Sequence, residues 1–362
     1  MSTYLAHLGR SNRLTLAGSV LLTALAGLLV AVGAGAVARF VVAGLALAAL
    51  AALVGQSIDQ VGERLGPGPT GLLQSTLGNL PELFVGIFAL REGLTGVVKA
   101  ALVGSVLGNA LLVLGMVFVA GGLRHGVQRF DAEGPRLNAS LLLLVVAALL
   151  VPTLASHLGT PAASHAATLS DDLAVILLIV YALSVPYYLN LTPEPSPAGN
   201  LPEAAGGREP WPLGLSVVLL ALGSAGAAVA SDWFVTPLEA ATATLGLSQA
   251  FTGLVVVAIA SNAVEHAVGV QFAWKAKPEY AISTTLNSPL QVALLLTPVL
   301  VLISHVVGPA KLTLVFPPLL VAALAISTVV VTVVIYDGEY TWIEGVALIG
   351  LYCILVAAFW WG

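Results

Sequence analysis

Long apolar runs separated by short polar breaks dominate the chain. Eleven stretches have about the twenty mostly apolar residues that a helix needs to cross a bilayer. They cover residues 14–33, 36–56, 70–92, 96–120, 137–156, 172–191, 211–230, 250–274, 281–305, 312–335 and 342–362. A membrane β-barrel would require alternating apolar and polar positions, and these Leu-, Val- and Ala-rich runs do not alternate. The pattern therefore predicts an all-α integral membrane protein with eleven transmembrane helices.

Composition agrees with this prediction and excludes other classes. Of 362 residues, 58% are hydrophobic and 9% are charged, whereas soluble domains carry about 25% charged residues. A net charge of -5 excludes the basic surface that nucleic-acid binding needs. The single Cys353 excludes an intrachain disulfide and a thiolate metal cluster. The lipid bilayer is the partner that composition predicts, and composition leaves the oligomeric state open.

The first stretch follows Arg10 and Arg13 and is interpreted as an N-terminal transmembrane helix within residues 1–35. A cleaved signal peptide is the competing interpretation. Most Lys and Arg, including the cluster from Arg124 to Arg136, fall on the side of the N-terminus, which the positive-inside rule assigns to the cytoplasm. An odd number of spans then places Gly362 outside. The short N-terminus and the Ala- and Gly-rich helices favour a bacterial inner membrane.

The Pro- and Gly-rich stretch 192–210 is predicted to be a cytoplasmic linker. It separates residues 36–191 from residues 211–362, and each part contains five predicted helices. Because five is odd, two homologous five-helix repeats would be inverted relative to each other in the membrane. Inverted repeats are typical of secondary transporters.

Polar motifs recur in the two halves. Residues 78–82 are Gly-Asn-Leu-Pro-Glu and residues 261–266 are Ser-Asn-Ala-Val-Glu-His, so Asn-x-x-Glu occurs as Asn79 with Glu82 and as Asn262 with Glu265. In the stretch that follows each motif, polar residues lie four apart: Ser105 with Asn109, and Asn287 with Gln291, next to Ser288. Residues three or four apart share a helix face. We therefore expect four helices that each present a polar face.

Glu82 and Glu265 lie near the middle of their stretches. A carboxylate at the bilayer centre costs about 3 kcal/mol, and no Lys or Arg lies at a matching depth to pair with either Glu. Carboxylate, amide and hydroxyl oxygens together favour a hard cation such as Ca2+. Desolvation and mutual repulsion favour protonation of an empty pair. The hypothesis is that one divalent cation and two protons compete for Glu82 and Glu265.

Other residues are candidates for the same site. Pro81 removes the helical donor to the carbonyl of Leu77, and Pro289 does the same for Thr285; a packing kink is the alternative. Ala260 is the repeat counterpart of Leu77. Gln74 and His266 are further candidates, His266 either on a proton path or in contact with a neighbouring helix. For the Asn, Ser and Gln residues, hydrogen bonding between helices without ligand contact is the competing interpretation.

At these residues the sequence resembles the CAX group of Ca2+/H+ antiporters. The resemblance rests on the two Asn-x-x-Glu motifs, on Ala89 to Gly93, on 104–109 and 289–294, and on Asp337-Gly338-Glu339 with Trp342. It implies one helix followed by two inverted five-helix repeats, with Glu82 and Glu265 as the ligands of cation and protons. It gives supporting roles to Asn79, Asn262, Ser105, Asn109, Ser288 and Gln291, and alternating-access movement to the second and seventh stretches.

The chain departs from the family pattern at three places. Position 261 is Ser where the family usually has Gly, and Asn287-Ser288-Pro289 replaces Gly-Ser-Ser. Both changes alter the polar lining and therefore concern ion preference. The linker carries only Glu194, Glu203 and Glu209, so regulation through an Asp- and Glu-rich helix between the halves is not expected.

The sequence thus predicts a secondary antiporter that exports cytoplasmic Ca2+ in exchange for H+ without a cofactor and without enzyme activity. One alternative is the same fold exchanging Na+ or another divalent cation. A second is an ion channel in which the two Glu form a selectivity ring. A third is an intramembrane hydrolase, which the sequence disfavours because it has no His-Glu-x-x-His and no Gly-x-Ser-x-Gly.

Overall fold

A computed structural model describes residues 9–65, 77–191 and 211–360. In this part of the chain, eight helices are long and apolar enough to cross a membrane, and a ninth span results if the bent pair Leu238–Leu245 and Gln249–Asn262 is counted as one. Two predicted stretches contain shorter helices, α5 (Leu80–Arg91) and α16 (Pro318–Val334). A mostly helical, multi-pass protein is therefore confirmed, whereas the count of eleven spans stays a prediction.

The helices form two compact units. The first contains residues 1–85 and 183–241 and is built on α2 (Arg10–Ala31), α3 (Ala36–Leu65) and α10 (Leu213–Val235). Helix α3 packs along both α2 and α10. The Ser19 hydroxyl of α2 donates to the carbonyl of Ala49 (3.0 Å), and the rings of Phe40 and Phe234 stack with centroids 4.7 Å apart. The second and seventh predicted helices thus belong to the same unit.

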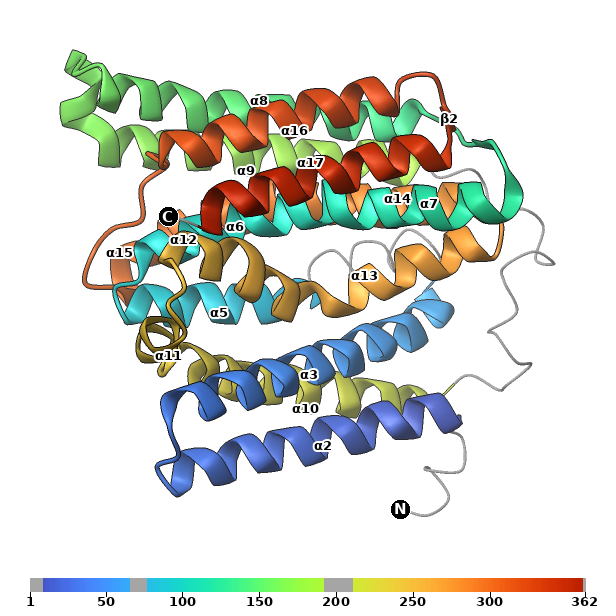
Figure 1. The fold of residues 1–362 in the computed structure, drawn as a ribbon, viewed down its shortest axis with the longest axis vertical. Coiled ribbons are helices and arrows are strands. Elements are labelled where there is room, and N and C mark those ends of the chain that lie inside the picture. The colour runs from blue at the N-terminus through green and yellow to red at the C-terminus, as the bar shows by residue number, and fades with distance from the viewer. Residues whose placement is uncertain (1–8, 66–76, 192–210, 361–362) are drawn as a thin grey trace. The chain divides into compact units, whose positions relative to one another are not determined.

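The second unit contains residues 86–182 and 242–362. Helix α17 packs along α7, α13 packs on α7 and α14, and α16 packs on α8 (Figure 1). Helix α9 begins in this unit and α11 ends in it. In chain order the elements after α5 are α6 (Thr95–Leu107), η1 (Gly108–Val113), α7 (Leu114–His125), α8 (Glu133–His157), η2 (Pro161–His165), α9 (Ala166–Leu191), α11 (Leu238–Leu245), α12 (Gln249–Phe251), η3 (Thr252–Val257), α13 (Ala258–Trp274), α14 (Pro278–Gln291), η4 (Val292–Leu296), α15 (Thr297–Val307), α16 and α17 (Trp342–Trp360).

Helix α6 crosses η3 at two glycines. A Cβ atom at Gly104 would lie 2.1 Å from the carbonyl oxygen of Leu254, and one at Gly253 would lie 2.6 Å from the carbonyl oxygen of Val97. No side chain fits between backbones this close, so glycine is required on both sides of the crossing. The contact joins the first half of the sequence to the second within one unit.

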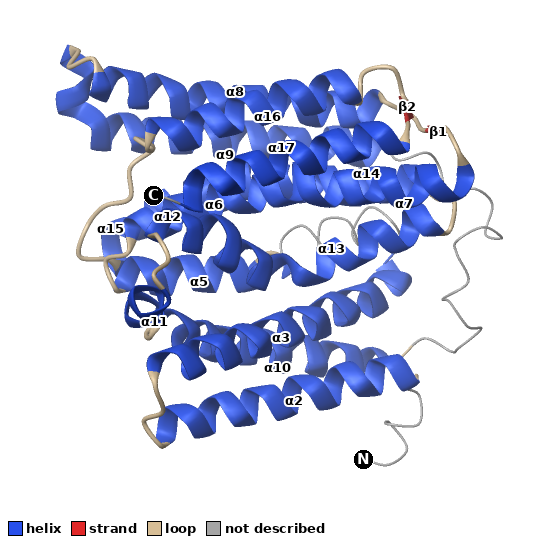
Figure 2. Cartoon of the chain, in the orientation of Figure 1, coloured by secondary structure: helices blue, strands red, loops and turns tan. Residues whose placement is uncertain are grey.

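Two short strands, which the sequence pattern did not predict, lie beside the helices (Figure 2). Strand β1 (Gln128–Arg129) pairs antiparallel with β2 (Glu339–Tyr340), and Arg129 forms an ion pair with Glu339 (2.9 Å). The ring of Tyr340 stacks on Phe118 with centroids 4.2 Å apart. Burial raises the pKa of Tyr340 to about 12. The strand pair therefore connects the chain after α7 to the chain before α17.

The helix predicted over 312–335 begins later in the structure than the sequence pattern indicated. Helix α16 begins at Pro318, and residues 312–317 are not helical. Pro317 and Pro318 explain the difference, because a residue before proline avoids the α conformation and proline is favoured in the first turn of a helix.

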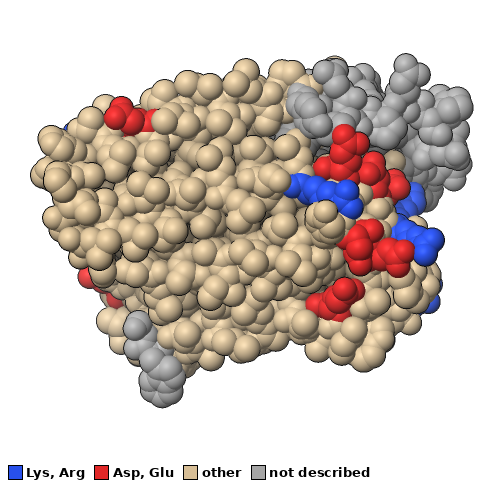
Figure 3. Space-filling model, turned by 90° about the horizontal axis from the view of Figure 1, so that it is seen from above, with Lys and Arg blue, Asp and Glu red and all other residues tan. Residues whose placement is uncertain are grey.

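Charged side chains are sparse on the surface. On the face drawn in Figure 3, the broad middle carries no Lys, Arg, Asp or Glu, and the charged side chains lie toward the two ends. An apolar band between charged ends is what a bilayer requires of the helices that face it.

Candidate cation site

Four residues that the sequence analysis selected form one buried hydrogen-bonded cluster. Asn109 Nδ2 donates to Asn262 Oδ1 (3.3 Å) and to Ser288 Oγ (3.1 Å). Asn262 Nδ2 donates to Ser105 Oγ (3.1 Å) and to the carbonyl of Ala258 (2.9 Å). All four side chains are buried. The cluster connects α6 and η1 with α13 and α14, so it joins both predicted repeats within the second unit.

Asn109 has an unused acceptor in this cluster. Its Oδ1 atom is buried and has no hydrogen-bond partner among the described residues. Buried polar atoms are nearly always satisfied, and an amide oxygen is a common ligand of hard cations. The Oδ1 atom therefore marks a place where a cation or a proton donor would be stabilised.

Segments of π-helix accompany the cluster. Asn109 lies in η1, η4 begins directly after Gln291, and η3 precedes the helix that carries Asn262. The Thr297 hydroxyl, at the first residue of α15, donates to the carbonyl of Val292 in η4 (2.8 Å). A π-helical turn shifts the register of the following residues and is common at functional sites. The two stretches whose polar motifs correspond, 96–120 and 281–305, thus share a π-helical segment at equivalent places.

The second Asn-x-x-Glu motif lies on the uninterrupted helix α13. Ala260, Asn262, Glu265 and His266 are all residues of this helix, and the side chain of Glu265 is outside the described part of the structure. His266 is partly buried. The Ser261 hydroxyl donates to the carbonyls of Val257 (3.0 Å) and Ala258 (3.3 Å), so it satisfies its own helix.

The first Asn-x-x-Glu motif lies at a helix start, in the first unit. Leu77 is helical, Gly78 and Asn79 form a turn, and α5 begins at Leu80, with Glu82 in its first turn. The Leu83 amide donates to the Asn79 carbonyl (3.0 Å), and both Asn79 and Glu82 are buried. The expected continuous helix is therefore wrong here. Pro81 does not interrupt a helix but occupies a first turn, where its missing N–H costs nothing.

Asn287 is engaged outside the cluster. Asn138 Nδ2 of α8 donates to Asn287 Oδ1 (2.9 Å), and Asn287 Nδ2 donates to Ser283 Oγ (3.3 Å). Asn138 was not predicted as a site residue, although it is the only amide side chain in the stretch 137–156. This contact makes Asn287 a link between α8 and α14.

The remaining candidates are placed as follows. Pro289 lies inside α14, where it leaves the Thr285 carbonyl without its helical donor, as expected. Gln291 is the last residue of α14 and is partly buried. Gln74 lies outside the described residues.

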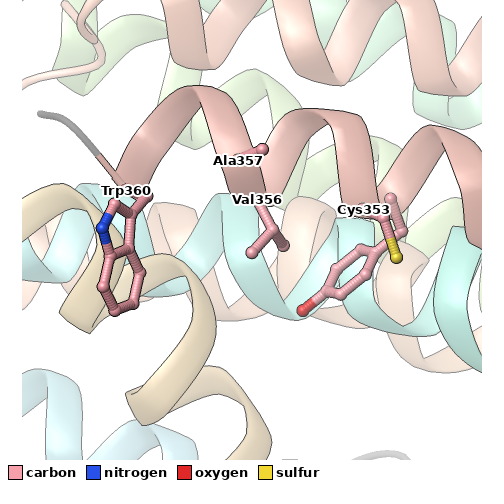
Figure 4. Close-up of a pocket in the computed structure, with 5 residues that line it drawn as sticks. Cys353, Val356, Ala357 and Trp360 are labelled. Carbon is pink, nitrogen blue, oxygen red and sulfur yellow. The ribbon is translucent and has the colours of Figure 1, made fainter.

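The described residues contain no group of three or more His, Cys, Asp or Glu side chains arranged to hold a metal ion. A separate cavity of about 380 Å³ lies on α17 and is lined by Tyr352, Cys353, Val356, Ala357 and Trp360 (Figure 4). It has no carboxylate or amide side chain, so it does not suit a hard cation.

The chain has several membrane-spanning helices, which carry buried amides and hydroxyls, cross closely at glycines and contain π-helical segments. This is the architecture of a membrane transporter. The chain belongs to the sodium/calcium exchanger protein family, whose profile matches residues 35–189 and 215–361. This confirms the resemblance drawn from the motifs.

Relatives with assigned names cover most of the chain. A protein of Synechocystis sp. named Ca(2+)/H(+) antiporter is 36% identical, over 90% of this chain and 92% of its own length. The Bacillus subtilis protein named Ca(2+)/H(+) antiporter ChaA is 33% identical, over 86% of this chain and 88% of its own length. The solved structure of native YfkE is 29% identical and superposes with a TM-score of 0.82, over 96% of this chain and 100% of that one.

Proposed function

We propose that this chain is a secondary active antiporter that exports cytoplasmic Ca2+ in exchange for H+, with Glu82 and Glu265 shared by the cation and the protons. The observation that carries the proposal is the buried Asn109–Asn262–Ser288–Ser105 cluster with the unpartnered oxygen of Asn109. The names of the relatives from Synechocystis sp. and Bacillus subtilis support the choice of Ca2+ and H+. No cofactor or nucleotide is part of the mechanism.

The two carboxylates supply the charge in this mechanism, and the cluster supplies orientation. Glu82 lies in the first turn of α5, where free backbone N–H groups favour negative charge. One Ca2+ neutralises two carboxylates, and two protons do the same after the ion leaves. Neutral amide and hydroxyl oxygens, such as Asn109 Oδ1, complete a hard-oxygen environment without adding charge. Occupancy by either the metal or the protons avoids a bare carboxylate pair in the membrane.

Movement is proposed for α3 and α10. They pack on each other in one compact unit, whereas the hydroxyl and amide cluster belongs to the other. In this scheme the N-terminal helix within residues 1–35 is followed by two inverted five-helix repeats, 36–191 and 211–362, with the linker 192–210 in the cytoplasm. The N-terminus is cytoplasmic and the C-terminus is outside, in a bacterial inner membrane.

Inverted membrane vesicles loaded at acid pH test the proposal directly. Addition of 45Ca2+ outside the vesicles should give saturable uptake that requires the pH gradient. A protonophore should abolish this uptake, and uptake that survives it would refute proton coupling. Acidification reported by a pH-sensitive dye must be lost when Ca2+ is added, because each Ca2+ that enters brings protons out.

Sodium is the second candidate for the counter-ion. The family description names a sodium/calcium exchanger, and Ser261 and Asn287-Ser288-Pro289 change the polar lining relative to the CAX pattern. In the same vesicles an imposed Na+ gradient without a pH gradient separates the two. Uptake of 45Ca2+ driven by Na+ alone would replace H+ with Na+ in the scheme.

A further inference from the structure

The connection between α15 and α16 is a non-helical segment that side chains from four helices bind. Residues 312–316 alternate between buried and partly exposed positions: Leu312, Leu314 and Phe316 are buried, whereas Thr313 and Val315 are not. Figure 1 shows this connection running from the end of α15 to the start of α16. We call residues 312–316 the strap. A non-helical segment among membrane helices needs partners for its backbone groups.

Three hydroxyls accept the backbone N–H groups of the buried strap residues. The Leu312 amide donates to Ser304 Oγ of α15 (2.8 Å), and the Leu314 amide donates to Ser170 Oγ of α9 (2.9 Å). The Phe316 amide donates to Thr153 Oγ1 of α8 (3.0 Å). All three hydroxyl residues are buried. Each buried strap residue is thus tied to a different helix.

Lys99 of α6 binds the two strap residues that are not buried, Thr313 and Val315. Its Nζ atom donates to the carbonyl of Val315 (2.6 Å) and to Thr313 Oγ1 (3.3 Å), and it lies 5.5 Å from the centre of the Phe316 ring. Within the described part of the chain, no carboxylate forms an ion pair with Lys99. A partly buried ammonium that has only neutral acceptors carries a desolvation cost, so generic packing does not account for a lysine at this position.

We propose that Lys99 is a positioning residue of the exchange reaction, which clamps the strap to α6 and thereby fixes the residues of the cation cluster on that helix. Ser105 follows Lys99 by about 9 Å along α6, at 1.5 Å per residue. Asn109 follows in η1, which continues the same helix. The strap joins α6 to α8, α9 and α15, so releasing Lys99 frees the end of α6 from three other helices. The transport part of this inference rests on the proposed function.

Two substitutions of Lys99 and one matched control test the clamp. Lys99→Met keeps a long apolar stem but removes the ammonium, and Lys99→Arg keeps a cationic donor. Lys311→Met removes the same charge from an exposed lysine next to the strap. The first measurement is hydrogen–deuterium exchange of the purified full-length protein, followed on the peptide that contains the amides of Leu312, Leu314 and Phe316.

Loss of the charged hydrogen bonds should accelerate amide exchange in the strap by about tenfold or more in Lys99→Met. Lys99→Arg should stay within about threefold of wild type, and Lys311→Met should leave exchange unchanged. Wild-type exchange in Lys99→Met would overturn the clamp. Because this measurement does not involve transport, it decides the clamp even if the proposed function fails.

The second measurement is 45Ca2+ uptake into inverted vesicles under a pH gradient, normalised to folded transporter from size-exclusion chromatography. Lys99→Met should lower the maximal rate by about tenfold with KM within about twofold, because the ligands still bind the ion but the helix arrangement from which the exchange step proceeds is populated less often. Lys99→Arg should restore most of the rate. Faster strap exchange with an unchanged maximal rate would overturn the positioning role. Absence of uptake in wild type would instead contradict the proposed function.

Discussion

The two Asn-x-x-Glu motifs have the same sequence pattern but different backbone conformations. The first lies at a helix start: Gly78 and Asn79 form a turn and Glu82 is in the first turn of α5. The second lies within the uninterrupted α13, which has neither glycine nor proline between Asn262 and Glu265. Free N–H groups at a helix start stabilise negative charge, whereas those inside a helix are already bonded. The duplicated motif therefore places its two glutamates on unequal backbones, one beside free N–H groups and one within a hydrogen-bonded helix.

The largest expected effect comes from removing either charge. Glu82→Gln and Glu265→Gln should each abolish Ca2+ exchange, because one remaining carboxylate leaves a divalent ion half neutralised. Glu279→Gln, on the exposed first turn of α14, is the control and should retain exchange. The measurement is 45Ca2+ uptake per inserted transporter. Near-wild-type uptake by either site variant would show that the substituted carboxylate is not required for exchange. The two motifs would then not have equivalent roles.

The next effect tests the helix crossing between the two halves of the sequence. Gly104→Ala places a Cβ 2.1 Å from the Leu254 carbonyl oxygen, so the backbones of α6 and η3 must separate. We expect destabilisation of about 1–3 kcal/mol, as for other overpacked sites, and strongly reduced transport. Gly350→Ala on α17, where no atom lies within 4 Å of the added Cβ, should change the thermal midpoint little. An equal shift for the two variants in a thermal unfolding assay would argue against a close crossing.

A smaller effect, on the KM for Ca2+, should separate Asn109 in the hydrogen-bonded cluster from Asn287 outside it. Asn109→Ala removes the unpartnered Oδ1 atom and both donor bonds, so the KM for Ca2+ should rise by about tenfold. Asn287→Ala should change KM by less than about threefold, since its Oδ1 is already bonded to Asn138. Initial rates of uptake over a range of Ca2+ concentrations give both values. The reverse order would place Asn287, and not Asn109, near the ion.

The smallest effect lies at the strand pair β1 and β2, because it is absent at neutral pH. Burial penalises the phenolate and raises the folded pKa of Tyr340 to about 12 from its ordinary value of 10.0, so the fold keeps its full stability below pH 10 and loses stability as the pH rises toward 12. By pH 11 the loss is about 1.4 kcal/mol, which corresponds to one pKa unit. Tyr340→Phe cannot ionise and should lose less stability over that range. Thermal midpoints at pH 9 and pH 11 measure the difference, and identical pH dependence in both proteins would contradict the burial of the hydroxyl.

Several features could be predicted from the sequence because they follow from local composition. A run of about twenty apolar residues in a bilayer must satisfy its own backbone groups, so it becomes a helix whatever surrounds it. The polar pairs in the apolar stretches similarly predicted that Asn109 and Asn262 share a polar face, and the two side chains are hydrogen-bonded to each other. The roles of Glu82 and Glu265 stay a prediction. The family membership rests on those same letters.

Other features were decided only by tertiary structure. The bond from Asn109 to Asn262 joins residues 153 positions apart, and the bonds of Lys99 to the strap join residues more than 200 apart. The non-helical strap was not predicted because its residues are as apolar as those of a helix, and three of its backbone N–H groups donate to hydroxyls of α8, α9 and α15. The hydrophobicity of a stretch is a local property of its sequence, so it predicts a membrane helix without knowledge of the neighbours. A hydrogen bond between helices forms only after packing has brought its two partners together, so the sequence alone does not predict it.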